Sequence, residues 1–227
     1  MEQLQRLSLL IGEDNIKKIV DKNVLIIGLG GVGSYALEAI VRSGAGTIII
    51  VDRDIIDITN LNRQLMTTQN NVGQYKTDVW ESRIKDINPE CQVIKITENI
   101  TPENIDCLFN YKIDYIIDAC DSVPTKKELI RQCVKKDIKL ICAMGTGNKL
   151  DPSRLKIMDI RKTAYDPLAK IIRKMVKEEK IKAEIMVVAS DEAPIKTNSN
   201  VIGSTSFVPS VAGLLCASYV INDIIRK

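Results

Sequence analysis

The 227-residue sequence contains no histidine. Ser-His-Asp and Cys-His catalysis and zinc sites built from imidazole are therefore excluded, because each of them needs a histidine side chain. The six cysteines are scattered and form no C-x-x-C pair, so we expect reduced and mostly buried thiols. A strong excess of one charge sign is also missing. The formal net charge of +3 neither requires nor excludes a polyanionic partner.

A long uninterrupted apolar run is absent as well. The N-terminal residues do not show the order of basic, apolar and small residues that marks a signal peptide. The longest late apolar stretch, residues 208–221, contains Pro209, Ser210, Gly213 and Ser218, and it is too short and too interrupted to span a bilayer. We therefore expect a buried helix there, no membrane partner, and a cytoplasmic protein with one α/β domain.

Residues 24–52 form the most informative stretch. A short apolar run ends at Gly28, and a Gly-x-Gly-x-x-Gly turn at Gly28, Gly30 and Gly33 leads into a helical pattern. A second apolar run is followed by Asp52, at a position where an acid commonly accepts hydrogen bonds from ribose hydroxyls. The stretch predicts a βαβ unit that binds a nucleotide, without indicating which nucleotide.

Strand and helix patterns alternate up to about residue 150, which is typical of a Rossmann-like, doubly wound and mostly parallel sheet. A helical arm at residues 1–22 precedes a nucleotide-binding core at 23–150, and residues 151–227 add a C-terminal extension of strands and a helix. Outside the βαβ unit the patterns predict helices at 4–19 with a break at Gly12, at 74–87, from a cap at Asp121 or Ser122 to 136, and at 207–225, and strands at 93–96, 115–118, 140–143, 156–160 and 184–188.

Five polar side chains outside the glycine turn indicate phosphate chemistry. They are Asn60, Arg63 and Gln64 in a long loop, Lys76 at the next helix, and Asp121 after a later strand. Ligands of open α/β sheets bind at the carboxyl ends of strands, so we expect these residues to meet in one crevice. There Arg63 and Lys76 would spread charge on a nucleotide phosphate, and Asp121 would hold Mg²⁺. From spacing alone, ordinary surface charges are an equally good interpretation.

Four segments together resemble the family of ubiquitin-activating and ThiF/MoeB-type adenylating enzymes over residues 6–150. They are IGLGGVGS, VDRDIIDITNLNRQ, GQYKTD and DYIIDACDS. The resemblance implies ATP rather than NAD, with the ribose held by Asp52, the phosphates addressed by the loop residues and Lys76, and Mg²⁺ bound by Asp121. The ATP-binding residues that it implies are Gly28, Gly30, Gly31, Gly33, Asp52, Asp54, Asn60, Arg63, Gln64, Lys76 and Asp121, of which Arg63, Lys76 and Asp121 act in catalysis.

Arg6 lies in the N-terminal arm, six residues before Gly12. It resembles an arginine that members of this family insert into the ATP site of a partner subunit. The resemblance therefore implies a homodimer in which Arg6 belongs to the cofactor-binding residues of the neighbouring site.

The cysteine positions distinguish between branches of the family. Many members carry a zinc site of two C-x-x-C pairs, and members that form thioesters or persulfides have a reactive cysteine in the crossover region. Residues 143–215 contain no cysteine, so covalent transfer through sulfur is disfavoured. Nearly the whole chain instead resembles the tRNA-modifying branch. That resemblance implies adenylation of the threonyl carboxylate of N6-threonylcarbamoyladenosine beside the anticodon, followed by closure of a hydantoin ring that expels AMP.

Two other functions are left open by the sequence. An adenylyltransferase acting on the C-terminal glycine of a ubiquitin-like sulfur carrier would share the ATP site but bind a protein. An NAD-linked dehydrogenase would use the glycine turn and Asp52, but Arg63, Lys76 and Asp121 would then be unexplained. A sulfur-transfer protein also stays open as a further partner.

Residues 161–182 form a basic, partly helical segment with an apolar stripe that includes Ile172, Met175 and Val176. A helix packed through that stripe would turn much of its positive charge outward. The charge indicates either a solvated surface or an edge that guides the phosphates of tRNA towards the ATP crevice.

Overall fold

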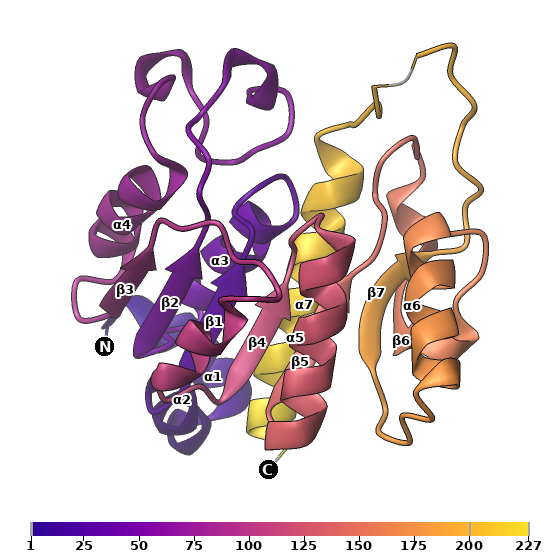
Figure 1. Cartoon of the computed structure of the whole chain (residues 1–227). Coiled ribbons are helices and arrows are strands. Elements are labelled where there is room, and N and C mark those ends of the chain that lie inside the picture. The colour runs from indigo at the N-terminus through magenta and orange to yellow at the C-terminus, as the bar shows by residue number, and fades with distance from the viewer. Residues whose placement is uncertain (1, 200, 227) are drawn as a thin grey trace.

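The computed structural model describes residues 2–199 and 201–226. Its centre is a seven-stranded sheet with the strand order β3-β2-β1-β4-β5-β7-β6 (Figure 1). Every neighbouring pair is parallel except β6 with β7, which confirms the expected Rossmann-like, mostly parallel sheet. The strands are β1 (Asn23–Ile27), β2 (Thr47–Val51), β3 (Gln92–Ile96), β4 (Tyr115–Asp118), β5 (Lys139–Ala143), β6 (Leu155–Asp159) and β7 (Met186–Ser190).

Seven α-helices in the described part of the chain surround this sheet. They are α1 (Gln5–Ile11), α2 (Glu13–Val20), α3 (Gly33–Arg42), α4 (Lys76–Ile87), α5 (Val123–Lys136), α6 (Pro167–Glu178) and α7 (Phe207–Ile225). Gly12 separates α1 from α2 at a φ of 85°, a value that glycine adopts without strain, so the predicted break in the arm is confirmed. The remaining predicted helix and strand ranges agree with the structure within about two residues.

The helices form one layer on each face of the sheet. Side chains of α3, α4 and α7 share one buried cluster with residues of β1, β2 and β5. On the other face, α5 packs over β1, β2 and β4, and α6 packs over β5 and β7. Both faces are therefore covered, as the nearly continuous apolar runs in the central strands require.

Helix α7 is long and apolar enough to cross a bilayer by length and composition. It packs against α3 instead, and its buried residues include Val208, Ala212, Cys216 and Val220. The predicted buried helix is confirmed, although it runs without interruption through Pro209. Proline is tolerated there because the first turn of a helix has no intrahelical partner for its backbone nitrogen.

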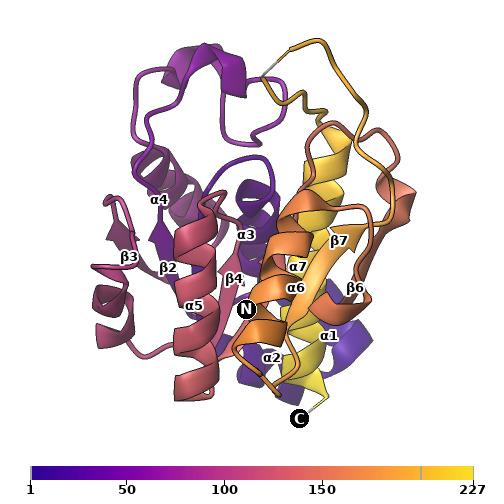
Figure 2. The ribbon, with the colours of Figure 1, turned by 45° about the vertical axis from the view of Figure 1, so that its right-hand side comes forward.

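Two long loops rise above the carboxyl ends of the strands. One is residues 53–75 between β2 and α4, and the other is formed by residues 191–199 and 201–206 between β7 and α7. Figure 2 shows the loops approaching each other above the sheet, and the side-chain amide of Asn62 donates to the carbonyl of Ser204 at 3.1 Å. The two loops together partly cover the carboxyl edge of the sheet, where the predicted site residues lie.

Candidate functional site

The glycine turn joins β1 to α3 by tight backbone packing. Gly28 has a φ of 85°, and its N–H donates to the carbonyl of Val51 at 2.8 Å. A Cβ atom at Gly28 would lie 2.7 Å from the carbonyl oxygen of Ala119, and one at Gly33 would overlap the carbonyl of Gly28. Glycine is thus required at both positions by the protein's own backbone.

Gly30 is different, because a Cβ atom there would meet no atom closer than the side-chain nitrogen of Gln64 at 3.8 Å. The packing of this chain does not require glycine at position 30. The residue leaves space on the turn directly before α3, where backbone N–H groups at a helix N-terminus attract an anion. This geometry fits close approach of a phosphate to the backbone.

Asp52 lies at the end of β2 and faces the same turn. Its carboxylate accepts from the N–H of Leu29 at 2.6 Å and from the N–H of Asp54 at 2.8 Å. The buried ammonium of Lys76 lies 2.7 Å from the carboxylate of Asp54 and 4.0 Å from that of Asp52. Burial raises the pKa of Asp52, against the lowering effects of Lys76 and the two N–H donors. The two acids and the lysine therefore form one cluster next to the turn.

The loop residues surround the turn from the other side. Gln64 is buried, and within the described residues its side-chain oxygen has no hydrogen-bond partner, so it can accept from a ligand hydroxyl or an ordered water. The stem of Arg63 lies against Gly31, while its guanidinium donates to the carbonyl of Thr59 at 2.9 Å. Asn60 closes a capping box with Asp57. The structure thus brings Arg63 and Gln64 to the turn and uses Asn60 to shape the loop.

Asp121 is exposed on the turn that follows β4. This turn packs directly against the glycine turn, because Ala119 lies over both Gly28 and Gly33. Ser122 forms the N-cap of α5 and accepts from the N–H of Thr125 at 3.4 Å, which settles the choice of cap. The predicted convergence of Asp121 with the glycine turn at one edge of the sheet is therefore found.

A buried ion pair lies beneath Asp121 and was not predicted. The ammonium of Lys126 is 2.7 Å from the carboxylate of Asp118, and both side chains are fully buried. Asp118 also accepts from the N–H of Cys120 at 3.1 Å. Burial, the largest single influence, lowers the pKa of Lys126, but the charge and hydrogen bond of Asp118 together with the nearby Cys120 and Cys142 raise it further, so the net pKa lies above its usual value. The pair holds the turn that carries Asp121.

One sequence signal for this pair exists. Lys126 stands at helical spacing with Leu129, Ile130 and Cys133, which are the buried apolar residues of α5. A lysine on the apolar stripe of a helix requires a carboxylate partner, because an unpaired buried charge is very costly. Asp118, the polar end of an otherwise apolar strand, is the matching acid.

A second buried pair lies at the end of β5. Lys149 donates to the carbonyl of Gly145 at 2.7 Å and to Asp166 at 3.3 Å, while Asp166 also caps α6 through the N–H of Ala169. Nearby, Asn148 and Gly203 exchange two hydrogen bonds of 2.7 and 2.8 Å. These contacts attach α6 and the 191–206 loop to the same edge of the sheet.

The thiols do not offer a nucleophile. Cys120 is nearest in sequence to Asp121, and burial, followed by the charge of Asp118, raises the pKa of its thiol. Burial likewise raises the pKa of Cys91 to about 11 and that of Cys216 to about 12. Thiols with such pKa values are protonated at neutral pH and are poor nucleophiles.

Arg6 is not part of this arrangement. It is exposed on α1, in the arm that packs beside the amino ends of the strands, and Leu4 of the same arm contacts Gly44 just before β2. Figure 1 shows α1 and α2 at the end of the sheet opposite the two long loops. Within one subunit, Arg6 and the glycine turn are therefore on opposite edges.

Comparisons with known proteins match nearly the whole chain rather than the glycine turn alone. The ThiF family model matches residues 2–226. A Bacillus subtilis tRNA threonylcarbamoyladenosine dehydratase is 42% identical over 243 residues, covering 100% of this chain and 96% of the relative. The Escherichia coli protein of the same name is 35% identical, covering 92% and 76%. A crystal structure of E. coli TcdA in complex with ATP matches with a TM-score of 0.93 at 33% identity, covering 100% of this chain and 95% of that chain.

Proposed function

The chain belongs to the ThiF family, and on that premise we propose that it is an ATP-dependent tRNA threonylcarbamoyladenosine dehydratase. The observation that carries the proposal is the full-length similarity to enzymes of that name, one of which has been crystallised with ATP. The carboxyl edge of the sheet provides the elements that a nucleotide needs: a glycine turn, a helix N-terminus, an acid and a buried lysine.

ATP would lie along this edge. Its phosphates would approach the backbone at Gly30 and Gly31, and its ribose hydroxyls would donate to Asp52, which already accepts two backbone N–H groups. Lys76 has three N–H donors, so it can keep its contact with Asp54 and also donate to a phosphate oxygen. The guanidinium of Arg63 would exchange its carbonyl partner for phosphate.

The reaction begins when the threonyl carboxylate of the modified adenosine attacks the α-phosphorus of ATP and pyrophosphate leaves. A carboxylate is an anion at neutral pH, so this step needs no general base and is compatible with a chain that has no histidine. A neighbouring nitrogen of the same modification then attacks the acyl carbon, loses its proton and expels AMP, which carries away the carboxylate oxygen. The product is the hydantoin, and the modified base has lost one water.

Asp121 would hold Mg²⁺ together with phosphate oxygens, and the ion would neutralise charge on the pyrophosphate leaving group. Mg²⁺ usually takes one or two carboxylates plus substrate phosphates, and an exposed single carboxylate beside a phosphate site fits that preference. Within the described residues no cluster of three acidic, cysteine or histidine side chains forms a preassembled metal site. The ion is therefore proposed to arrive with the nucleotide.

We assign a homodimer to the proposed enzyme. Arg6 and the proposed ATP site lie at opposite edges of one subunit, so Arg6 can serve an ATP site only in a second copy. Mixing Arg6→Ala subunits with Asp121→Ala subunits should restore part of the activity that each variant lacks. Failure to recover activity, after subunit exchange has been demonstrated, would show that Arg6 does not act in trans.

The sulfur-carrier adenylyltransferase is the second candidate function because it uses the same ATP site. It is disfavoured by the extent of the similarity to a dehydratase, which includes residues 151–227. A tRNA substrate also makes a cytoplasmic location the natural one for the proposed enzyme.

Pyrophosphate release tests the function directly. Purified protein with ATP and Mg²⁺ should release pyrophosphate when given tRNA that carries threonylcarbamoyladenosine, and the RNA product should be lighter by one water. Unmodified tRNA is the matched control and should give only background release. Release that depends instead on a carrier protein ending in glycine would establish the adenylyltransferase. Thermal stabilisation by NAD but not by ATP with Mg²⁺ would contradict both adenylating functions.

A further inference from the structure

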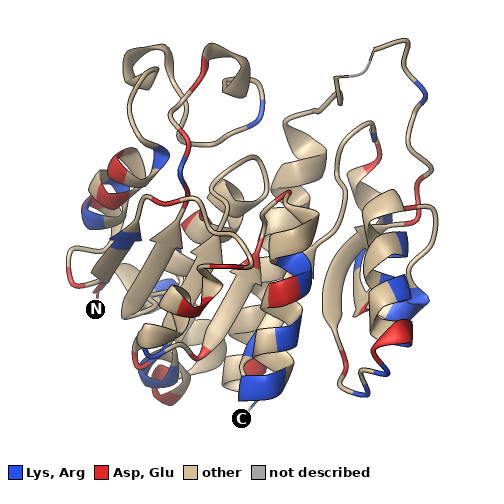
Figure 3. Ribbon diagram, in the orientation of Figure 1, with Lys and Arg blue, Asp and Glu red and all other residues tan. Residues whose placement is uncertain are grey.

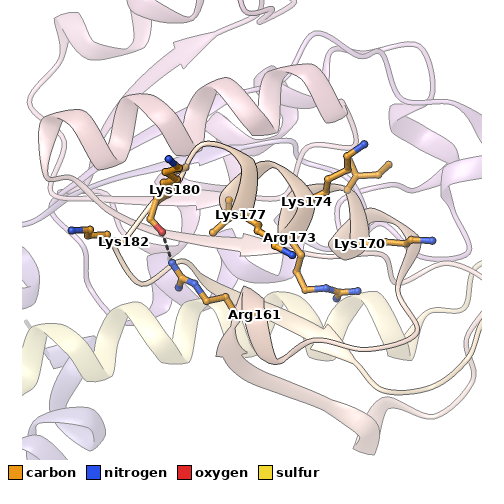
Figure 4. A pocket seen from close by; sticks show the side chains of 10 residues that line it. Arg161, Lys170, Arg173, Lys174, Lys177, Lys180 and Lys182 are labelled. Carbon is orange, nitrogen blue, oxygen red and sulfur yellow. Dashed lines mark hydrogen bonds between the residues drawn. The ribbon is translucent and has the colours of Figure 1, made fainter.

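We infer that the groove along α6 binds the phosphates of the stem of the tRNA anticodon arm, an inference that rests on the proposed function. The groove has a volume of about 1020 Å³ and lies between α6 and the segments that flank it (Figure 4). Its basic side chains are Arg161, Lys170, Arg173, Lys174, Lys177, Lys180 and Lys182, and its lining contains no carboxylate. We call it the α6 groove.

Three of these cations are engaged within the protein. Arg161 pairs with Asp159 at 2.7 Å and donates to the carbonyl of Ile181, and Arg173 donates to the carbonyl and hydroxyl of Thr163. Lys174 lies 3.7 Å from Glu178, a loose and exposed contact. Arg161 and Arg173 therefore fix the walls of the groove, so only part of the positive charge of the basic segment faces outward.

Four lysines are left to face the solvent. Lys170, Lys177, Lys180 and Lys182 are exposed, and no carboxylate of residues 2–199 or 201–226 pairs with them. The nearby carboxylate of Glu179 is bound at 2.7 Å by Arg131 of α5 and so is held outside the groove. Such flexible point charges suit phosphates, whose recognition needs charge but no fixed geometry.

The direction of the groove relates it to the proposed ATP site. Helix α6 begins at the carboxyl edge, where Asp166 meets Lys149 and Gly145, and ends near Lys180 and Lys182, which precede β7 at the amino edge. Figure 3 shows Lys and Arg residues along much of its length. Twelve helical residues span about 18 Å. If the reacting base of a tRNA lies at the carboxyl edge, the nucleotides that contact Lys177, Lys180 and Lys182 must therefore lie well away from that base.

An RNA stem satisfies this requirement. Double-stranded RNA is recognised mainly through its phosphates and 2′-hydroxyls, and its charge density matches a row of unpaired lysines. The floor of the groove consists of lysine stems together with Ile171 and Ile181, and lysine stems commonly lie along apolar surface while their ammonium groups stay in water. Contacts of this kind would hold any tRNA whose loop presents the modified base.

The test compares two triple variants of equal charge change. Lys170→Gln, Lys177→Gln and Lys180→Gln form the groove variant, and Lys17→Gln, Lys18→Gln and Lys112→Gln, which lie on other faces, form the control. The groove variant should bind tRNA roughly 50-fold or more weakly at 0.15 M salt, and its log-log salt slope should be flatter by about two to three. The control variant should stay within about threefold of the parent. Both should melt like the parent, because all six side chains lie at or near the surface.

A second comparison uses the length of the RNA. The parent should bind intact tRNA more tightly than an anticodon loop closed by a shortened stem, whereas the groove variant should bind the two about equally. The shortened loop, once modified, should still release pyrophosphate from ATP with the groove variant. Absence of release with the parent would overturn the proposed function without touching the binding comparison, which can be made with unmodified tRNA.

Two results would overturn the inference itself. One is a groove variant that keeps both the affinity and the salt slope of the parent. The other is a groove variant that binds tRNA normally but loses binding to vesicles of mixed phosphatidylcholine and phosphatidylglycerol, since the lysines would then serve an anionic membrane surface.

Discussion

Two groups of lysines in this protein have opposite surroundings in the structure. Lys76, Lys126 and Lys149 are at least 95% buried, and each lies within 3.3 Å of a carboxylate. The lysines of α6, by contrast, are exposed, and most have no carboxylate partner among the described residues. The difference separates lysines that hold the site together from lysines that are free to meet a partner.

The buried lysines share a location. Lys76 joins the acids after β2, Lys126 joins Asp118 at the end of β4, and Lys149 joins the segment after β5 to α6. Each therefore fixes backbone at the carboxyl edge, where the proposed ATP site lies. A buried ammonium can replace its lost hydration only by donating to several fixed oxygen atoms, so these contacts make the surrounding loops rigid.

The largest expected loss of stability comes from breaking a buried ion pair. Lys126→Met leaves the Asp118 carboxylate buried without a counter-charge, and we expect the free energy of unfolding to fall by about 3–5 kcal/mol. Urea denaturation measures this loss. Adding Asp118→Asn should recover much of the stability, because the amide removes the unpaired charge and can still accept from Cys120. Lys177→Met is the exposed control, and a loss from it as large as that from Lys126→Met would invalidate the comparison.

The next effect separates chemistry from stability. Asp121→Ala should lower the rate of pyrophosphate release by about 100-fold or more, equivalent to about 2.7 kcal/mol, while the melting temperature stays close to that of the parent. The carboxylate is exposed, so its removal leaves no buried charge. Arg63→Ala and Lys76→Ala should show a loss of rate of similar size. Near-normal rates in all three variants would place the reaction elsewhere in the molecule.

The smallest effect concerns an exposed pair. Arg131 binds Glu179 at 2.7 Å beside α5 and α6, yet both side chains are more than a third exposed, so Arg131→Gln should change the free energy of unfolding by less than about 1 kcal/mol. Glu179 would then be free to approach the α6 groove, and tRNA affinity should fall slightly. A large loss of stability would mean that exposed charges on this face also hold the fold.

The sequence by itself determined the architecture around the glycine turn. Gly28 and Gly33 are dictated by backbone packing, apolar runs mark β1, β2 and β4, and local spacing is enough to read such features. It also predicted that Asp52, Gln64 and Asp121 meet at one edge, since the carboxyl ends of parallel strands always share an edge. The resemblance to adenylating enzymes added ATP, which spacing alone could not select.

Tertiary structure decided which charged residues are buried in pairs and which face water. Lys126 and Lys177 both stand on amphipathic helices in basic surroundings, but one faces Asp118 across the core and the other faces water. Arg173 and Lys170 belong to one basic segment, yet only Arg173 turns back to Thr163. The burial and pairing of a charged side chain depend on residues that are distant in the chain. The free energy of its charge depends on these spatial neighbours far more than on its neighbours in sequence.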